Sequence, residues 1–296
     1  MRDFRVETAI ITGAGGGIGS ALAAEAVAHG ASRLFLLDID EDKARRVADG
    51  LARDGLGIEV RGCDVTDHAA LERIAEQTLS SGSGPVLVCA NAGVTVPRAP
   101  LFEADPGNLR WVFEVNLFGC WATLKAFGSR MAASGRSGRL LVTASEHSVG
   151  VPFAGGSGYT ASKHAVLGLA DALRRELPAQ IGISALIPGL VATDLWGAIG
   201  SRPERFGGPG DPAPGAGRLM AEGIPPDVVA RLAFEGMAAG RFLIATQTHV
   251  QRYADARRRD VDEAFAALDA SDAPKASYDI GEIQSRLAAQ AARENS

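Results

Sequence analysis

A cluster of glycines lies between a short apolar run and a helical stretch near the start of the chain. The cluster reads Gly13-Ala14-Gly15-Gly16-Gly17-Ile18-Gly19. It follows the apolar run Val6–Thr12 and leads into the alanine-rich stretch Ile18–His29, which has helical spacing. Glycines at a strand-to-helix turn permit a tight bend and let a pyrophosphate approach the backbone at the helix N-terminus. The cluster therefore predicts an α/β sheet whose first turn binds a dinucleotide.

Short apolar runs alternate with helical stretches along most of the chain. The further expected strands are Leu34–Asp38, Ile58–Cys63, Val86–Cys89, Arg139–Thr143, Ile183–Ile187 and Arg241–Ala245. The stretches with helical character between them are Glu41–Arg53, a segment starting at Asp67, Pro106–Ala133, Tyr159–Leu177 and Pro226–Ala239. Strands that are apolar throughout and alternate with helices are typical of a parallel sheet covered on both faces. We therefore expect a doubly wound α/β domain over residues 1–248.

Two segments depart from this alternation. Leu195–Pro226 is rich in glycine and proline and is long for a connection. An insertion after a strand's C-terminal end lies over the ligand crevice of an open α/β sheet, so it is a candidate substrate lid; the alternative is a plain surface loop. Residues 249–296 are alanine-rich and polar. They predict a C-terminal helical extension and tail.

The composition argues against several classes of protein. The 296 residues carry a formal net charge of -5, and the basic footprint of a nucleic-acid-binding protein is absent. Cys63, Cys89 and Cys120 lie far apart in apolar stretches without metal-like spacing, which predicts buried thiols and no metal. The N-terminus has no apolar signal core, and no run approaches the ~18 apolar residues that span a membrane. These features predict a cytoplasmic protein.

Asp38 ends the second expected strand, about twenty residues after the glycine cluster. A carboxylate at this place accepts hydrogen bonds from the adenosine ribose hydroxyls and repels a 2′-phosphate. No arginine or lysine lies inside the glycine cluster or directly after Asp38 to offset that repulsion. The residue therefore predicts NAD rather than NADP as the cofactor.

Tyr159 and Lys163 are four residues apart in a helical stretch. Side chains at this spacing share one face of a helix, so the pair holds a phenol beside an ammonium. A nearby cation favours the phenolate, and we expect it to lower the pKa of the tyrosine enough for proton exchange with an alcohol or ketone. An isolated pair with this spacing also arises by chance on helix surfaces.

The spacing Thr-Gly-x-x-x-Gly-Ile-Gly of residues 12–19 resembles the short-chain dehydrogenase/reductase family. Further matches follow in the family's order: Asp64-Val65, Asn91-Ala92-Gly93, Asn116, Ser145, Tyr159 with Lys163, and Pro188-Gly189 followed by Thr193. The resemblance covers Val6 to Leu195 and continues less specifically to Ala245. It implies a Rossmann-type fold, a nicotinamide cofactor, and a homodimer or homotetramer built on the two long helices.

The resemblance also implies a role for each site residue. Tyr159 would be the general acid/base. Lys163 would lower its pKa and bind the nicotinamide ribose, Ser145 would hydrogen-bond the substrate oxygen, and Asn116 would pass protons on through a water. The implied cofactor-binding residues are Gly13, Gly15, Gly17, Ile18, Gly19, Asp38, Asp64, Val65, Asn91, Gly93, Tyr159, Lys163, Pro188, Gly189, Val191 and Thr193.

Two of these assignments leave alternatives open. Ser145 precedes Tyr159 by one residue more than the commonest family spacing, and Ser148 is a rival for its role. We favour Ser145 because it directly follows the expected strand Arg139–Thr143. Asn116 could instead be a polar residue with a structural hydrogen bond inside its helix.

The expected substrate pocket is mostly apolar. Its candidate residues are His147, Val149, Phe153, Leu190, Leu195, Trp196 and Phe206. No arginine is clearly placed to bind a carboxylate. We therefore expect NAD-dependent interconversion of a hydrophobic secondary alcohol and its ketone. Two alternatives are a nucleotide-binding regulatory protein without turnover and an epimerase or dehydratase on the same fold.

Overall fold

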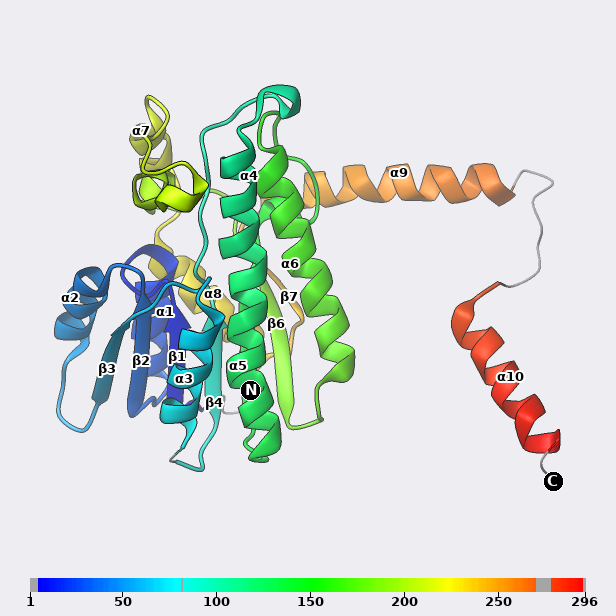
Figure 1. Ribbon diagram of the computed structural model, residues 1–296, viewed down its shortest axis with the longest axis horizontal. Helices are drawn as coiled ribbons and strands as arrows, with labels where there is room; N and C mark the ends of the chain where they lie inside the picture. Colours follow the sequence, from blue (N-terminus) through cyan, green and yellow to red (C-terminus); the bar gives the residue numbers. More distant parts are fainter. Residues whose placement is uncertain (1–4, 81, 270–277, 295–296) are drawn as a thin grey trace. The chain divides into compact units, whose positions relative to one another are not determined.

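The computed structural model describes residues 5–80, 82–269 and 278–294. Its strands form one parallel sheet in the order β3-β2-β1-β4-β5-β6-β7 (Figure 1). The strands are β1 (Thr8–Thr12), β2 (Arg33–Asp38), β3 (Gly57–Gly62), β4 (Val86–Ala90), β5 (Gly138–Thr143), β6 (Ile181–Ile187) and β7 (Leu243–Ala245). Every expected run is a strand, and the doubly wound α/β fold is confirmed.

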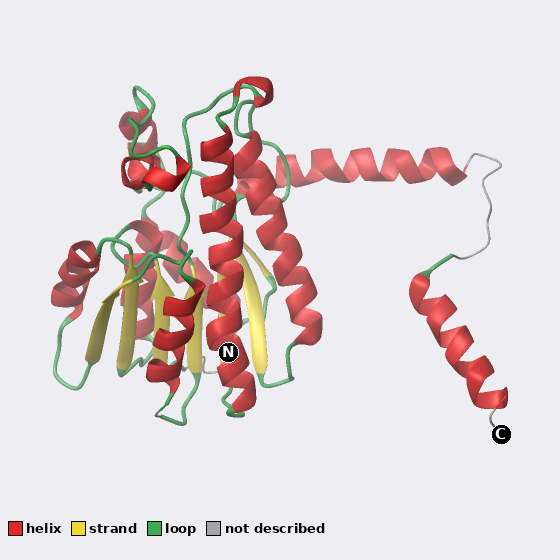
Figure 2. Cartoon of the chain, in the orientation of Figure 1, coloured by secondary structure: helices red, strands yellow, loops and turns green. Residues whose placement is uncertain are grey.

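Helices cover both faces of the sheet, as Figure 2 shows. One face carries α1 (Gly17–Ala28), α2 (Glu41–Leu51) and α8 (Pro226–Ala238), and the other carries α3 (His68–Leu79), α5 (Cys120–Ala133) and α6 (Ser157–Glu176). Successive strand side chains point to opposite faces. In β1, Ile10 therefore packs into the core on the α5 side, while Ala9 and Ile11 pack on the α1 side.

The order of the strands creates the binding crevice. From β1 the chain moves outward through β2 and β3, and it then returns to the other side of β1 for β4 to β7. At such a switch point the loops after the two central strands diverge, which leaves a crevice at the carboxyl ends of the strands. The glycine cluster and the Asn91-Ala92-Gly93 segment follow β1 and β4, so both lie at this crevice.

The helical stretch predicted over Pro106–Ala133 is not continuous. The chain forms α4 (Pro106–Phe113), then a π-helical stretch over Glu114–Gly119, and then α5. Widened turns of this kind are frequent at functional sites. Here the interruption contains Asn116, whose side chain bonds to a neighbouring loop instead of facing solvent. Residue type and periodicity do not indicate such an interruption.

The insertion between β6 and α8 folds into short helical pieces. They are 3₁₀ turns at Leu195–Ser201 and Glu204–Phe206, followed by α7 (Ala216–Ala221). By its internal contacts the chain divides into two compact units, 1–254 and 255–296. The second unit contains most of α9 (Gln251–Asp269) and all of α10 (Ile280–Glu294). Within the described ranges, no helix combines the length and the apolar character needed to cross a membrane.

The three cysteines are buried and free, as predicted. Burial raises the pKa of the thiols of Cys63 and Cys120 to about 12, so both remain protonated at neutral pH. They pack as small apolar side chains.

Candidate active site

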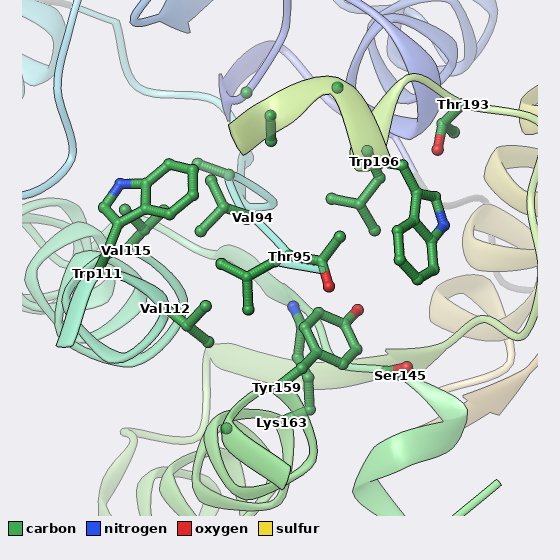
Figure 3. A pocket seen from close by; sticks show the side chains of 18 of the residues that line it. Val94, Thr95, Trp111, Val112, Val115, Ser145, Tyr159, Lys163, Thr193 and Trp196 are labelled. Atoms are coloured by element: carbon green, nitrogen blue, oxygen red, sulfur yellow. The ribbon is translucent and has the colours of Figure 1, made fainter. Parts of the chain in front are cut away.

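A cavity of about 830 Å³ opens at the carboxyl ends of the central strands (Figure 3). The glycine cluster, the end of β2 and the loops after β3 and β4 form one part of its wall. The loops after β5 and β6, α4, the start of α6 and the insertion form the rest. Every residue predicted to bind the cofactor lines this cavity except Gly19. The cavity is therefore large enough and suitably placed for a dinucleotide together with a substrate.

The glycine cluster forms a close-fitting cradle. Gly13 and Gly17 have φ values of 65° and 53°, in the left-handed region that favours glycine. A Cβ on Gly13 would lie 2.9 Å from the Cα of Ala92, and one on Gly17 would lie 2.9 Å from Cγ2 of Thr193. No side chain caps the N-terminus of α1, which begins at this wall of the cavity. Uncapped N–H groups at a helix N-terminus fit a pyrophosphate.

Gly19 does not line the cavity wall, and its contact with the cofactor stays a prediction. A Cβ there would lie 2.0 Å from the carbonyl oxygen of Gly13, so Gly19 lets α1 pack against the turn. Asn91 supports the turn from the other side, since its Nδ2 donates to the oxygens of Thr12 (3.1 Å) and Gly13 (3.2 Å). Its Oδ1 accepts a hydrogen bond from Thr143 at 2.9 Å, which joins β1, β4 and β5.

Asp38 is fixed at the end of the cavity next to the glycine cluster. Its Oδ2 accepts a hydrogen bond from the N–H of Gly15 at 2.7 Å, and its Oδ1 accepts one from the N–H of Asp40 at 2.9 Å. The first turn of α2 also brings Lys43 to this wall, with its Nζ 3.9 Å from Oδ2 of Asp40. The sequence reasoning missed Lys43 because it lies five residues after Asp38. Only the turn from β2 into α2 returns it to the cavity.

Asp64 lines the same end of the cavity and has several partners. Its Oδ1 accepts hydrogen bonds from the N–H and the hydroxyl of Thr66, and Arg205 from the insertion lies 3.2 Å from its Oδ2. Burial raises the pKa of Asp64, but these hydrogen bonds and the Arg205 cation outweigh it and hold the pKa below its ordinary value. The Arg205 contact also ties the insertion to the loop after β3.

Tyr159 and Lys163 project from α6 into the cavity (Figure 3). The Nζ of Lys163 lies 5.7 Å from the centre of the Tyr159 ring and donates to the carbonyl of Thr143 at 2.8 Å. Burial lowers the pKa of Lys163 to about 8. Burial also raises the pKa of Tyr159 to about 12, although a hydrogen bond with Ser145 opposes this. The expected lowering of the Tyr159 pKa by Lys163 is therefore wrong here, because desolvation of the phenolate dominates.

The structure brings Ser145, and not Ser148, to the cavity wall. Ser145 hydrogen-bonds to Tyr159, and its Oγ accepts the N–H of His147 at 3.2 Å. The hydroxyl of Ser148 donates to the carbonyl of Lys163 at 2.8 Å and accepts the N–H of Ser145 at 3.1 Å. Ser148 therefore holds the loop against α6, while Ser145 faces the space in which a substrate oxygen would lie.

Asn116 is buried and does not line the cavity. Its Oδ1 accepts the N–H of Val94 at 2.7 Å, and its Nδ2 donates to the carbonyl of Val94 (3.0 Å) and to Ser162 (3.1 Å). Both amide donors are thus in use, which favours the structural alternative for this side chain. A Cβ on Gly93 would lie 3.3 Å from Oδ1 of Asn116 and 3.4 Å from Nζ of Lys163, so this glycine lets both groups approach the loop.

Only some of the residues expected to contact the substrate line the cavity. His147, Phe153, Leu190, Leu195 and Trp196 line it, whereas Val149 and Phe206 do not. Phe206 instead packs against the main core. The cavity wall also contains Val94, Thr95, Trp111, Val112 and Val115, which sequence reasoning missed (Figure 3). Val94 and Thr95 come from the loop after β4, Trp111 and Val112 from α4, and Val115 from the π-helical stretch. No motif in these segments distinguishes a cavity residue from a core residue.

His147 lies beside the catalytic candidates. Its ring centre is 5.2 Å from that of Tyr159 and 4.7 Å from that of Phe153, and its Nδ1 lies 2.7 Å from the hydroxyl of Thr160. Burial lowers the pKa of His147 to about 4, and the cation of Arg98 adds to this effect. The ring is therefore neutral at neutral pH.

The lowered pKa of His147 predicts a loss of stability in acid. As the pH falls from 6.5 towards 4, the unfolded chain binds a proton that the folded chain excludes. This difference removes up to about 3 kcal/mol of unfolding free energy. Urea unfolding at both ends of this pH range should show that His147→Gln removes this part of the acid sensitivity. His29→Gln, a change at a partly exposed histidine, should leave the acid sensitivity in place. An equal dependence of the unfolding free energy on pH in wild type and in His147→Gln would contradict the prediction.

Comparisons with known proteins agree with this geometry. The family model described as short chain dehydrogenase matches residues 7–204. A "1-deoxy-11-beta-hydroxypentalenate dehydrogenase" of Streptomyces exfoliatus is 37% identical over 194 residues, covering 65% of this chain and 70% of that protein. The "(+)-borneol dehydrogenase 1" of Salvia officinalis is 31% identical over 172 residues, covering 58% of this chain and 64% of that protein.

Solved structures show the same fold. A short chain dehydrogenase/reductase from Burkholderia phymatum in complex with NAD superposes with a TM-score of 0.80 and 28% identity, covering 94% of this chain and all of that one. A short-chain dehydrogenase from Sphingobium yanoikuyae in complex with NADPH has a TM-score of 0.70 and 24% identity, covering 93% and 99%. The same fold thus occurs in a protein solved with NAD and in a protein solved with NADPH.

Proposed function

The chain belongs to the short-chain dehydrogenase family of oxidoreductases, which bind a nicotinamide cofactor, and from this premise we propose that it interconverts a hydrophobic secondary alcohol and its ketone with NAD. One observation carries the proposal. The Tyr159 phenol and the Ser145 hydroxyl meet in the same cavity as the uncapped N-terminus of α1. A proton-transfer group and a dinucleotide cradle in one cavity are what this reaction needs.

The side chains at the cavity have different roles in the proposed reaction. A nicotinamide cofactor held by these residues would supply the hydride-transfer chemistry of the reaction. In reduction the Tyr159 phenol donates a proton to the substrate oxygen, and in oxidation its phenolate form accepts the hydroxyl proton. With a pKa of about 12 its phenol is protonated at neutral pH, which is the form that reduction uses. Ser145 donates a hydrogen bond to the substrate oxygen, and the Lys163 cation stabilises negative charge on the phenol oxygen.

A hydrophobic substrate is supported by the cavity wall and by the relatives. Val94, Trp111, Val112, Val115 and Trp196 surround the space in front of Tyr159 (Figure 3). Two of the relatives are dehydrogenases named for a hydroxypentalenate and for borneol. Both names specify an alcohol, and borneol is a hydrocarbon ring system with one hydroxyl group. An apolar cavity of this kind favours an alicyclic or aromatic alcohol over a sugar.

The proposed preference for NAD depends on Asp38. Two unit charges 4 Å apart repel each other by about 1 to 4 kcal/mol across the range from water to a protein surface, so NADP should bind roughly 5- to several-hundred-fold more weakly. Asp38→Asn keeps the shape of the side chain and removes its charge. We expect it to reduce the NAD:NADP ratio of kcat/KM by roughly 5- to several-hundred-fold. A matched Asp42→Asn change on α2, outside the cavity wall, should leave the ratio unchanged.

The function is tested by following NADH absorbance with a panel of secondary alcohols, with NAD and NADP in parallel. Reduction of NAD by bulky apolar alcohols is the expected result. A strong preference for NADP would overturn the role of Asp38. Product formation without net cofactor reduction would replace the proposal with an epimerase or dehydratase, and binding of NAD without turnover of any substrate would favour a regulatory protein.

A further inference from the structure

An arginine lies among aromatic rings at the cavity wall. The Cζ of Arg98 is 3.4 Å from the centre of the Phe153 ring and 5.6 Å from that of Trp196. All three residues line the cavity, although the side chain of Arg98 remains exposed. Stacking on an aromatic ring engages the face of a guanidinium and leaves the N–H groups at its edge available.

The backbone around Arg98 is held in place. The N–H of Ala99 donates to the carbonyl of Gly155 at 3.0 Å, which joins the loop after β4 to the loop after β5. Gly155 has a φ of 83°, and a Cβ on it would lie 3.3 Å from the Cβ of Arg98. Because Phe153 precedes Gly155 in the same loop, this contact also sets the distance between the guanidinium and the ring on which it stacks.

Arg98 differs from the other lysines and arginines of the cavity wall in what it contacts. Within the described residues, Lys43 faces Asp40, Lys163 donates to the carbonyl of Thr143, and Arg205 binds Asp64 and Thr66. No carboxylate in that part of the chain lies within 4.0 Å of the Arg98 guanidinium. A cation held at a cavity wall with its hydrogen-bond donors free is suited to an anionic group of a ligand.

Arg98 lies on the substrate side of the cavity. It stacks on Phe153, Phe153 contacts His147, and His147 contacts Tyr159. The adenosine end, marked by Asp38, is formed by other elements, so Arg98 is not placed for the adenosine part of the cofactor. An anion bound by Arg98 would thus be separated from the reacting carbon by an apolar part of the substrate.

We propose that Arg98 binds a carboxylate of the substrate, so that the enzyme acts on hydrophobic hydroxy acids whose carboxylate is remote from the carbinol. This inference rests on the proposed function of the same cavity. The planar fork of an arginine matches the two oxygens of a carboxylate, and Phe153 and Trp196 supply apolar surface beside it. This proposal departs from the expectation that no arginine is placed to bind a carboxylate, because Arg98 lies at the cavity wall.

Binding of a ligand that cannot react tests the proposal independently of turnover. The probes are cyclohexylbutanoate and its uncharged amide, titrated calorimetrically into the protein with NADH present. Wild type should bind the acid about 10- to 100-fold more tightly than the amide, as expected for hydrogen bonds to a charged group. Arg98→Gln should reduce this preference to within about twofold, and Arg98→Lys should keep part of it because the charge remains.

A matched control distinguishes an effect at this site from an effect of the protein's net charge. Arg110 is exposed on α4 and does not line the cavity, so Arg110→Gln makes the same change of charge elsewhere. It should retain the full preference for the acid. Equal binding of acid and amide by wild type, no binding of either, or an unchanged preference in Arg98→Gln would overturn the proposal. Unchanged NADH affinity in Arg98→Gln shows that the variant is folded.

Turnover distinguishes failure of this inference from failure of the proposed function. Hydroxycyclohexylbutanoate and its methyl ester are offered with NAD to wild type and to Arg98→Gln. Loss of kcat/KM for the acid alone, by about 10- to 100-fold, supports the carboxylate site. Oxidation of acid and ester with equal kcat/KM keeps the dehydrogenase and removes the carboxylate site. If neither is oxidised, the proposed function is in question, while the binding titration still decides the role of Arg98.

Discussion

Replacing Tyr159 with phenylalanine is expected to lower kcat by about 10²- to 10⁴-fold, the range that general acid–base catalysis supplies. The variant removes only the hydroxyl that exchanges a proton with the substrate oxygen. Its ring still fits beside His147 and Lys163, because the change removes a single oxygen atom. Any loss of NADH affinity should be much smaller than the loss of kcat, since no ring contact is lost. Steady-state kinetics and a fluorescence titration of NADH measure the two quantities.

Tyr253 provides the matched control for this change. Its hydroxyl accepts a hydrogen bond from Arg252, and it does not line the cavity. Tyr253→Phe should leave both kcat and NADH affinity unchanged. If Tyr159→Phe retained more than about a tenth of wild-type kcat, the hydroxyl would not be the proton-transfer group, given the rate factor that such groups provide.

Replacing Gly19 with alanine should disrupt the cofactor cradle. The added Cβ would lie 2.0 Å from the carbonyl of Gly13 and 2.8 Å from Nδ2 of Asn91. Backbone on one side and a bonded amide on the other leave little room for adjustment, so α1 must move away from the turn. We expect a loss of about 1 to 3 kcal/mol of unfolding free energy, which is typical of overpacking. NADH affinity should fall at least about 100-fold, because the helix N-terminus no longer meets the pyrophosphate.

Gly16, in the same cluster, is the matched control for stability. A Cβ on Gly16 has no atom within 4 Å, and its φ of 174° is extended backbone that any residue adopts. Gly16→Ala should therefore unfold at the wild-type temperature, whereas Gly19→Ala should unfold several degrees lower. Equal melting temperatures for the two variants would show that a side chain at position 19 does not destabilise the contact between α1 and the turn.

Most of the sheet could be predicted from the sequence because its inner strands are buried on both faces. Such strands are mostly apolar, as β4 is throughout, and the turn residues that follow them, such as Gly13 and Pro188, mark their limits. The outer strand β3 is partly exposed and carries Glu59 and Arg61. The π-helical stretch around Asn116 could not be predicted, since it depends on hydrogen bonds to Val94 and Ser162 that join segments distant in sequence. Local preferences carry no information about such contacts.

The site was predictable where its residues follow strand ends in a fixed order. Ser145 and Asp38 are examples, because the end of a parallel strand locates a side chain at the crevice. Arg98 and Lys43 were missed because loop and helix geometry alone bring them to the cavity. The pKa of Tyr159 was predicted in the wrong direction, since spacing along a helix gives the distance to Lys163 but not the depth of burial.

Transfer of a labelled hydride tests the central claim most directly. A secondary alcohol that the enzyme oxidises is deuterated at its carbinol carbon, and the reduced cofactor is analysed by mass spectrometry after reaction with NAD. We predict that the deuterium appears in the reduced nicotinamide with wild type and that Tyr159→Phe forms this product far more slowly. Ketone formation with no deuterium in the cofactor would contradict direct hydride transfer and, with it, the function proposed for this cavity.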